Sequence, residues 1–516
     1  MAAALAAALL ASVAASAVEV GTAAGSRGDK TADAGVVAAM PRALYDLETN
    51  VSITAEPNPL GGHDLVFVNG AFYVIVGMIV VAVAYGAYVD TTYSLEVAAK
   101  GHPAAWLLGM LAASYVLLIP GIFTELFSYN IFVQLEIVLY SLPVNFAANI
   151  TREATTESMA SLIGLLFRTG GSMGALLVIF YAIVLPVSKV LLLTFGERWR
   201  NSSSVARRAN ARQCILFVQI VSKWASPDMF AYILLMFLLR NLGHPPEVQS
   251  KAKLDIGFLC FSIFCISSTF SSLAIRLPEV NDGEGREPPS WVRRCGRVGV
   301  LQLAVLLAAT YVVLMGAGLY VPCMGLRLNV DSLVKPNGPV PTNFKPILDN
   351  LHLEDKVKAN VSLWQCMLAL KRWTAEGEMT CAVAFVLLAV FVLAFTSLDV
   401  VFLVLAMLQA YRGTSPERTL RIAWVLKHVS MLDVFCMGVI VVCLAGAAYK
   451  KMGIELELMH GIGLLIGAEA VHGLLYHVAH ASEDNHDENE AHYGESEEAS
   501  PARPLVATVD SHEAAE

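Results

Sequence analysis

The chain has 516 residues, of which 56% are hydrophobic and only 15% are charged, and its mean hydropathy is +0.59. These values exclude an ordinary soluble domain and are typical of membrane proteins with several spanning segments. The formal net charge is −9, and an acidic balance gives no indication of nucleic-acid binding.

Residues 1–17 are predicted to be a signal peptide. The segment has an apolar core and ends in Ala15-Ser16-Ala17, whose small side chains suit signal peptidase. Its removal would leave residues 18–64 as an extracellular or lumenal segment. The sequence therefore predicts an integral multi-pass protein of the secretory pathway, in the plasma membrane or an organellar membrane.

Long apolar runs predict the membrane-spanning helices. A run of about 18 residues or more crosses roughly 30 Å of hydrocarbon as a helix. Nine segments qualify: 65–89, 104–123, 173–195, 214–240, 254–276, 299–321, 380–409, 422–447 and 454–479. A shorter run, Ile131–Leu142, contains Gln134 and Glu136 and predicts an interfacial helix. The expected fold class is therefore all-α, a polytopic membrane protein.

The distribution of basic residues predicts the topology. With nine spans and an outside N-terminus, the inside loops hold 14 Lys and Arg in 67 residues, whereas the outside loops hold 13 in 127. Basic residues concentrate on the cytoplasmic side, so the C-terminus is predicted to be cytosolic. The glycosylation sequons at Asn50, Asn149 and Asn360 fall outside, and only that at Asn201 falls inside.

A sequence pattern recurs in the second half of the chain. "KWASPDMF" at 223–230 and "HVSMLDVF" at 428–435 align Asp228 with Asp433, and a basic residue lies five positions earlier in each, Lys223 or His428. Further matches join "LIPG" at 118–121 to "YVPC" at 320–323, and "SLIGLLFRTGGSM" at 161–173 to "SLWQCMLALKRWTAEGEM" at 362–379. The agreement in order, spacing and residue type predicts two copies of one four-span unit. An even number of spans makes the copies parallel.

These observations divide the chain into segments. The repeats occupy residues 104–277 and 299–480, and an extra helix and loop at 65–103 precede them. Residues 278–298 form a cytoplasmic linker. Residues 481–516 carry 11 acidic residues and one arginine, which predicts a disordered acidic cytosolic tail.

The repeated unit resembles the paraquat-inducible protein A (PqiA) family. The similarity covers both repeats, and its best-preserved pieces are "IVLPVSKVLLL" (183–193), "VSKWASPDMF" (221–230) and "KHVSMLDVF" (427–435). The resemblance implies a role in lipid transport or membrane integrity, with membrane lipids and a protein of a lipid-transport complex as partners. The zinc-ribbon CxxC pairs typical of bacterial members are absent from this chain, and the second copy has "FTSLDVVFLV" (395–404) where the first has Pro186 and Lys189.

Asp228 has two possible roles. It can lie in the first turn of a helix that begins at Pro227, where the macrodipole stabilises a carboxylate and Trp224 anchors the chain at the headgroups. Alternatively, it lies in a cleft beside Lys189 and binds a headgroup. Lys189 itself can simply extend its ammonium group toward the membrane surface.

The second copy offers a comparable set of polar residues. Asp433 has the same two interpretations as Asp228, with Asp399 and His428 as its polar neighbours. On the last helix, Glu469, His472, Tyr476 and His480 share one face at 100° per residue. This stripe either faces a neighbouring helix or forms a metal or proton-relay site.

The remaining signals concern covalent chemistry. Cys323 and Cys366 share one outside loop and are candidates for a disulfide bond. The sequence contains no nucleotide-binding loop, nucleophile elbow or HExxH motif, and it indicates no cofactor, no metal and no enzymatic activity.

Three functions therefore remain open. The first is PqiA-like lipid transport. The second is proton- or ion-coupled transport of small molecules through the intramembrane polar residues. The third is a membrane scaffold that recruits partners through its acidic tail.

Overall fold

The computed structural model describes residues 60–99, 103–139, 142–149, 155–242, 248–278, 290–328, 359–446 and 454–498. The predicted signal peptide, the sequon at Asn50 and most of the predicted linker lie outside these residues. The predicted tail is described as far as Glu498, where the last helix ends. Its first part is therefore helical, and glutamate, a residue of high helix propensity, is frequent there. The predicted disorder of the remaining tail stays a prediction.

The first half of the chain begins with two long apolar helices and continues through strands and broken helices. Its elements, in order, are α3 (Leu65–Ala99), α4 (Ala105–Phe123), β1 (Glu125–Leu139), β2 (Leu142–Asn149), β3 (Thr155–Ser158), α5 (Met159–Thr169), α6 (Ser172–Ile179), the π-helix η1 (Phe180–Val184), α7 (Leu185–Arg200), α8 (Val205–Val221), the 3₁₀-helix η2 (Ser222–Ala225), α9 (Pro227–Asn241), β4 (Val248–Leu254) and α10 (Ile256–Leu273).

The second half follows nearly the same order of element types. Its elements are α11 (Ser290–Tyr320), β5 (Met324–Leu328), β6 (Ala359–Val361), α15 (Leu363–Ala375), α16 (Met379–Val386), the π-helix η4 (Leu387–Ala394), α17 (Phe395–Tyr411), α18 (Glu417–Val429), α19 (Leu432–Gly446), β7 (Ile454–Leu458) and α20 (His460–Glu498).

Eight segments of the described chain are long and apolar enough to cross a membrane. They are Leu65–Thr92, Ala105–Phe123, Ser172–Arg200, Ile256–Leu273, Val298–Tyr320, Met379–Tyr411, Glu417–Gly446 and His460–Ser482. The predicted span at 214–240 is not among them, because its helix is interrupted, and a ninth span stays a prediction. Pro227 has no N–H to donate to a helix, and the chain breaks at Ser222–Ser226, which leaves α9 with only 15 residues.

Each half also contains a small antiparallel sheet, so the fold is not purely helical. In the first sheet, β2 and β3 pair with successive parts of β1, and β4 pairs with residues 127–133 of the same strand. In the second sheet, β5 pairs with β6 and β7. The predicted interfacial helix at Ile131–Leu142 was wrong, since residues up to Leu139 belong to β1. The alternation of Val133, Gln134, Leu135 and Glu136 is the period of a strand.

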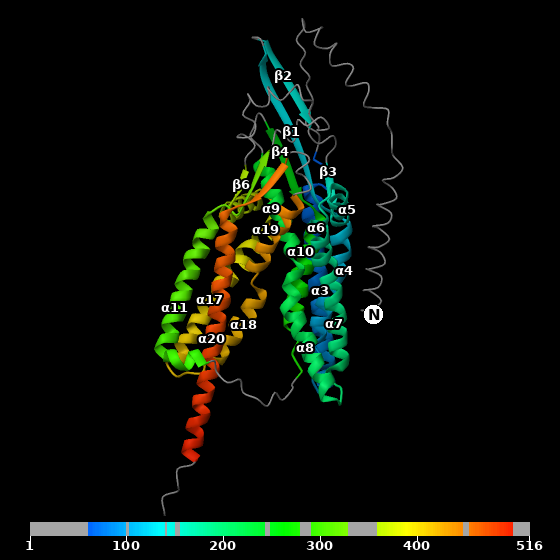
Figure 1. Ribbon diagram of the computed structural model, residues 1–516. Helices are drawn as coiled ribbons and strands as arrows, with labels where there is room; N and C mark the ends of the chain where they lie inside the picture. The colour runs from blue at the N-terminus through cyan, green and yellow to red at the C-terminus, as the bar shows by residue number, and fades with distance from the viewer. Residues whose placement is uncertain are drawn as a thin grey trace, which may run out of the picture.

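The two sheets lie at the same end of the helical body, which we call the sheet end (Figure 1). Two polar contacts join the halves there. Arg240 of α9 forms two bonds with Glu378, at 2.8 and 2.9 Å. The amide of Asn69 in α3 donates to Gly377 O and accepts from the backbone of Met379.

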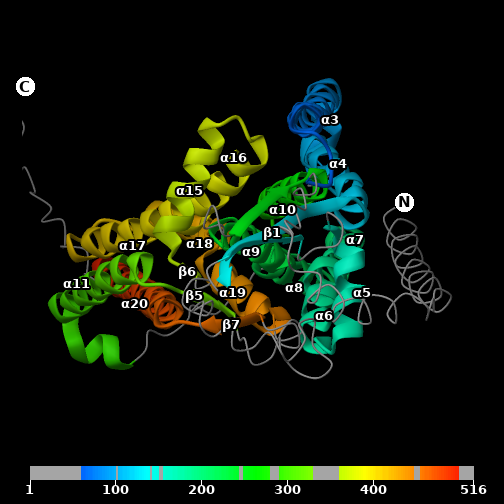
Figure 2. The same cartoon turned by 90° about the horizontal axis from the view of Figure 1, so that it is seen from above.

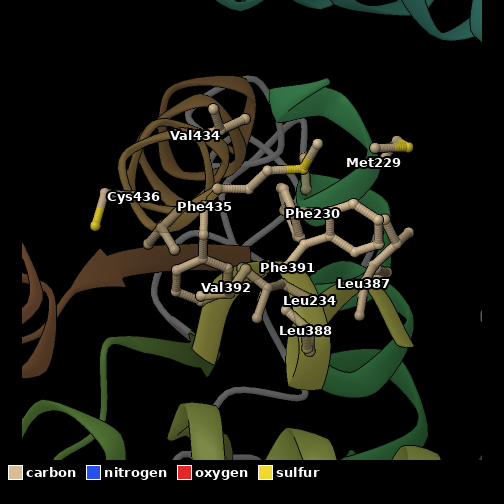
Figure 3. Packing of buried hydrophobic residues seen from close by; sticks show 14 of the residues in the cluster. Met229, Phe230, Leu234, Leu387, Leu388, Phe391, Val392, Val434, Phe435 and Cys436 are labelled. Atoms are coloured by element: carbon tan, nitrogen blue, oxygen red, sulfur yellow. The ribbon is translucent and has the colours of Figure 1, made fainter. Parts of the chain in front are cut away.

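The short helices α9 and α19 lie side by side in the middle of the molecule (Figures 1 and 2). Phe230 and Phe435 meet edge to face at 5.8 Å between ring centroids, packed with Leu388 and Phe391 of η4 (Figure 3). Gly438 allows the helices to approach closely, because a Cβ there would lie 2.7 Å from the carbonyl oxygen of Pro227. The centre of the protein is therefore built from two helices that begin inside it.

Candidate polar site at two broken helices

The first helix break lies between α8 and α9, at Ser222–Ser226, and leaves polar backbone groups there available for contacts with side chains. α9 begins at Pro227 with Asp228 in its first turn, so the predicted helix start is confirmed. Proline suits this position because its missing N–H would have no helical partner. Trp224, in the break, is half-buried and packs against the apolar core; its predicted role as a headgroup anchor stays a prediction.

The second break lies between α18 and α19, at Ser430 and Met431. The N–H of Met431 donates to the carbonyl oxygen of Phe391, at 3.0 Å. Phe391 lies in the π-helical turns of η4, a conformation often found at functional sites. The break is thus fixed by a backbone bond to a neighbouring helix and not left open.

Lys223 connects the two breaks. Its ammonium group donates to Lys427 O and Ser430 O, both at 3.2 Å, and pairs with the Asp433 carboxylate at 2.8 Å. Asp433 also accepts from the N–H of Val434 at the start of α19. A cation at the end of α18 and an anion at the start of α19 both complement the helix dipoles. A lysine of the first half therefore holds together the broken helix of the second half.

Asp228, the sequence counterpart of Asp433, is in a different state. Its side chain is 1% exposed. Neither carboxylate oxygen has a hydrogen-bond partner among the described residues, and the hydroxyl of Tyr232, one turn further along α9, is also buried without one. A buried polar group without a partner costs free energy unless something else supplies the bond. Two such groups on one face of α9 suggest that a ligand or a proton completes the site.

His428, the counterpart of Lys223, does not reach Asp228. Its Nδ1 lies 2.7 Å from Trp424 O on its own helix, and its ring contacts the Trp424 ring at 4.2 Å between centroids. The sequence predicted Asp399 and His428 as polar neighbours of Asp433, whereas the ion pair that Asp433 forms in the structure is with Lys223. The two halves are alike in order of elements but not in the pairing of their charges.

Lys189 is also buried, with 5% of its surface exposed. It donates to Ser222 Oγ at 2.6 Å and to Ser268 O at 2.7 Å. No ion pair with Asp228 is present among the described residues, so the predicted contact between these two side chains is not formed. Instead, Lys189 lines a small cavity with Ser188 and Ser222, whose other walls are Leu185, Leu192, Phe217, Val218, Val221 and Ala225.

A second polar cluster lies wholly within the second half. His472 Nε2 of α20 is 2.7 Å from the Asp399 carboxylate of α17, and both side chains are fully buried. Glu469 lies 3.5 Å from His472 Nδ1. Lys427 places its ammonium group 3.5 Å from the centre of the Tyr476 ring, a favourable cation–π distance. The predicted polar stripe of α20 thus faces neighbouring helices.

The candidate covalent sites lie near the sheets. Cys323 and Cys366 are both buried and both carry free thiols, so the predicted disulfide between them is not formed in this structure. Burial raises the pKa of the Cys323 thiol to about 12 and that of Cys366 above its usual range, which the neighbouring Cys323 raises further. Asn149 ends β2, and Asn360 lies in β6 opposite Gly325; their glycosylation stays a prediction.

Sequence reasoning did not single out Lys223 as the partner of Asp433, nor Ser222 and Ser268 as the acceptors for Lys189. The recurrence of a basic residue five positions before each aspartate was the signal for Lys223. The serines gave none. Hydroxyl groups such as that of Ser222 are common in membrane helices, Ser268 accepts through its backbone carbonyl, which every residue has, and both lie far from Lys189 in sequence.

Comparison with family models, with curated proteins and with solved structures found no match for this chain. The resemblance to the PqiA family therefore rests on the quoted sequence motifs.

Proposed function

We propose that the protein is a membrane transporter of anionic lipids, formed by two parallel copies of a PqiA-like unit. The recurrence of helix, strand, broken helix and strand in both halves supports the duplication. The position of both sheets at one end supports parallel copies (Figure 1). In this proposal the α8–α9 segment is a ninth, discontinuous crossing, the C-terminus is cytosolic, and the protein has no enzymatic activity.

The observation that carries the proposal is the Lys189 cavity. Lys189 lines a small cavity whose other walls are mostly apolar. In this proposal the cavity widens on binding, the ammonium group binds the phosphate of a phospholipid, and the apolar walls contact its acyl chains. Two of the three N–H groups of Lys189 have acceptors in the protein. Phe217, on the cavity wall, is 53% exposed, so the cavity borders a surface that faces lipid.

Broken helices fit a transport role. Discontinuous helices form the substrate sites of many transporters, because irregular backbone is tolerated inside a membrane only where protein or a cavity covers it. The Lys223–Asp433 pair joins the halves at this point, and the unpaired Asp228 lies on the adjacent helix. A protein partner from a lipid-transport complex is implied by the PqiA resemblance alone.

The first test is mass spectrometry of lipids that co-purify with the protein in mild detergent. We expect an anionic phospholipid enriched over the bulk extract, and a loss of about tenfold or more in Lys189→Met, since a charge-assisted bond contributes about 1.5–3 kcal/mol. Lys371→Met, which removes an exposed lysine of α15, is the control and should retain the lipid. Equal lipid content in wild type and Lys189→Met would contradict the proposal.

Proton-coupled transport of a small solute is a second candidate. It is favoured by the fully buried Asp399–His472 pair, because intramembrane carboxylates and histidines commonly relay protons. It predicts uptake driven by a pH gradient that is lost in His472→Gln. Uptake that is independent of the pH gradient would count against it.

A further inference from the structure

Three potential metal ligands from distant parts of the sequence meet at the sheet end. His63 precedes α3, Glu125 begins β1, and Asp255 is the N-cap of α10. His63 Nδ1 lies 3.0 Å from an Asp255 oxygen and 3.5 Å from a Glu125 oxygen. The three ligand atoms all lie within 4.8 Å of one another, so that small side-chain movements would bring them to one ion.

Hydrogen bonds within the described part of the protein do not provide a partner for every polar atom in and around this cluster. The imidazole Nδ1 carries at most one proton, which one carboxylate can accept. Glu125 Oε2 is inaccessible to solvent and has no hydrogen-bond partner among the described residues. Ser128 is fully buried, and its hydroxyl also has no partner there. Lys253 donates to His63 O, and within the described part of the chain it forms no ion pair with either carboxylate.

The backbone holds Asp255 in a fixed orientation. Its Oδ1 accepts from the N–H of Ile256 at 2.8 Å, and its Oδ2 accepts from the N–H of His63 at 2.9 Å. A Cβ at Gly62, where φ is +84°, would lie 2.3 Å from Asp255 Oδ2 and 2.4 Å from Ser128 Oγ. Only glycine allows this approach, and it places the partnerless serine hydroxyl beside the carboxylate.

We propose that His63, Glu125 and Asp255 bind a divalent transition-metal ion of the Zn²⁺ class. One imidazole nitrogen and two carboxylate oxygens are common zinc ligands, whereas Mg²⁺ and Ca²⁺ prefer oxygen ligands alone. Water or Ser128 Oγ supplies the fourth ligand. Backbone N–H bonds to a ligating carboxylate are the outer-shell contacts that fix metal ligands in place.

The ion would join three elements that are far apart in sequence. His63 belongs to the segment before α3, which precedes the proposed repeats, while the two carboxylates belong to the first repeat. Because the unfolded chain has no preformed site, metal binding stabilises the folded state. The site would thus fix the extra helix to the first half at the sheet end. No sequence pattern indicated this site, since no two of its ligands lie close enough in the chain to form a motif.

The test is metal content and Co²⁺ spectroscopy on full-length, tag-free protein in detergent. After chelator treatment and reloading, we expect one Zn²⁺ per chain, a higher unfolding temperature with Zn²⁺ than with chelator, and a ligand-field absorption band with Co²⁺. Glu125→Gln, which keeps the shape of the side chain, and His63→Ala should lose all three. His460→Ala, which removes an exposed histidine at the start of α20, is the control and should keep them.

The same measurements can overturn the site. Equal zinc in wild type, Glu125→Gln and His63→Ala would mean an adventitious ion only. The proposal would also be contradicted if the wild-type protein showed neither a Co²⁺ absorption band nor a Zn²⁺-dependent rise in unfolding temperature. This result does not depend on whether the variants fold.

Discussion

Removing the Lys223 ammonium group tests how the halves are joined. Lys223→Met leaves the Asp433 carboxylate without its cation and removes the donor from Lys427 O and Ser430 O. The side chains of Lys223 and Asp433 are only 10% and 19% exposed, so water cannot fully replace these bonds. Breaking a buried pair costs about 3–5 kcal/mol, whereas an average hydrogen bond between membrane helices contributes about 0.6 kcal/mol. We expect Lys223→Met to lower the free energy of unfolding by about 3 kcal/mol.

A double-mutant cycle isolates the ion pair. Unfolding is measured by denaturant titration in mixed micelles for Lys223→Met, Asp433→Asn and the double variant. The coupling energy should be about 1.5 kcal/mol or more, because the second substitution removes a charge that the first has already left unpaired. Asp228→Asn is the matched control: since its carboxylate has no partner among the described residues, loss of the charge should be neutral or stabilising.

Two results would refute this reasoning. One is additive effects of Lys223→Met and Asp433→Asn, with a coupling energy below about 0.5 kcal/mol. The other is a loss of stability in Asp228→Asn as large as that in Asp433→Asn, which would mean that the two aspartates are equivalently bonded.

Three further predictions concern ion pairs, packing and accessibility. Arg240→Met removes the buried ion pair with Glu378 and should lower the free energy of unfolding by about 2 kcal/mol. Arg421→Met removes an exposed ion pair and should change the same free energy by less than about 0.5 kcal/mol. Equal effects of the two substitutions would contradict the role of burial. Gly438→Val places a side chain against the start of α9 and should cost about 1–3 kcal/mol, measured by the same titration; unchanged stability would mean that the helices separate easily. Because burial raises the pKa of Cys323 to about 12, little thiolate forms at pH 8, so iodoacetamide should label it slowly in the folded protein and rapidly after unfolding. Mass spectrometry measures both rates, and rapid labelling of the folded protein would contradict the burial.

Most spanning helices could be predicted from the sequence because lipid imposes a simple rule of length and apolarity. The rule failed at 214–240, where composition alone concealed the helix break at Ser222–Ser226. It also failed for β1, since the short apolar run at Ile131–Leu142 suits a strand or a helix equally well by hydrophobicity. There, the two-residue alternation was the better guide.

The candidate site was only partly predictable. The recurring motif identified Asp228 and Asp433, and helix periodicity brought Glu469 and His472 to one face. The motif could not show that only one aspartate is paired, because that depends on how α9 and α19 cross. Asp399 and His472 likewise lie on different helices and are 73 residues apart in sequence, so no local pattern predicts their contact.

The most direct test of the proposed function is lipid movement across a bilayer. Purified protein is reconstituted into vesicles that contain a labelled anionic phospholipid, and the rate of its transfer between leaflets is measured. Wild-type protein and Lys371→Met should both accelerate transfer over empty vesicles, and Lys189→Met should be slower by about tenfold, the loss expected for one charge-assisted bond. Transfer at the rate of empty vesicles, or an equal rate in Lys189→Met and wild type, would contradict lipid transport through the Lys189 cavity.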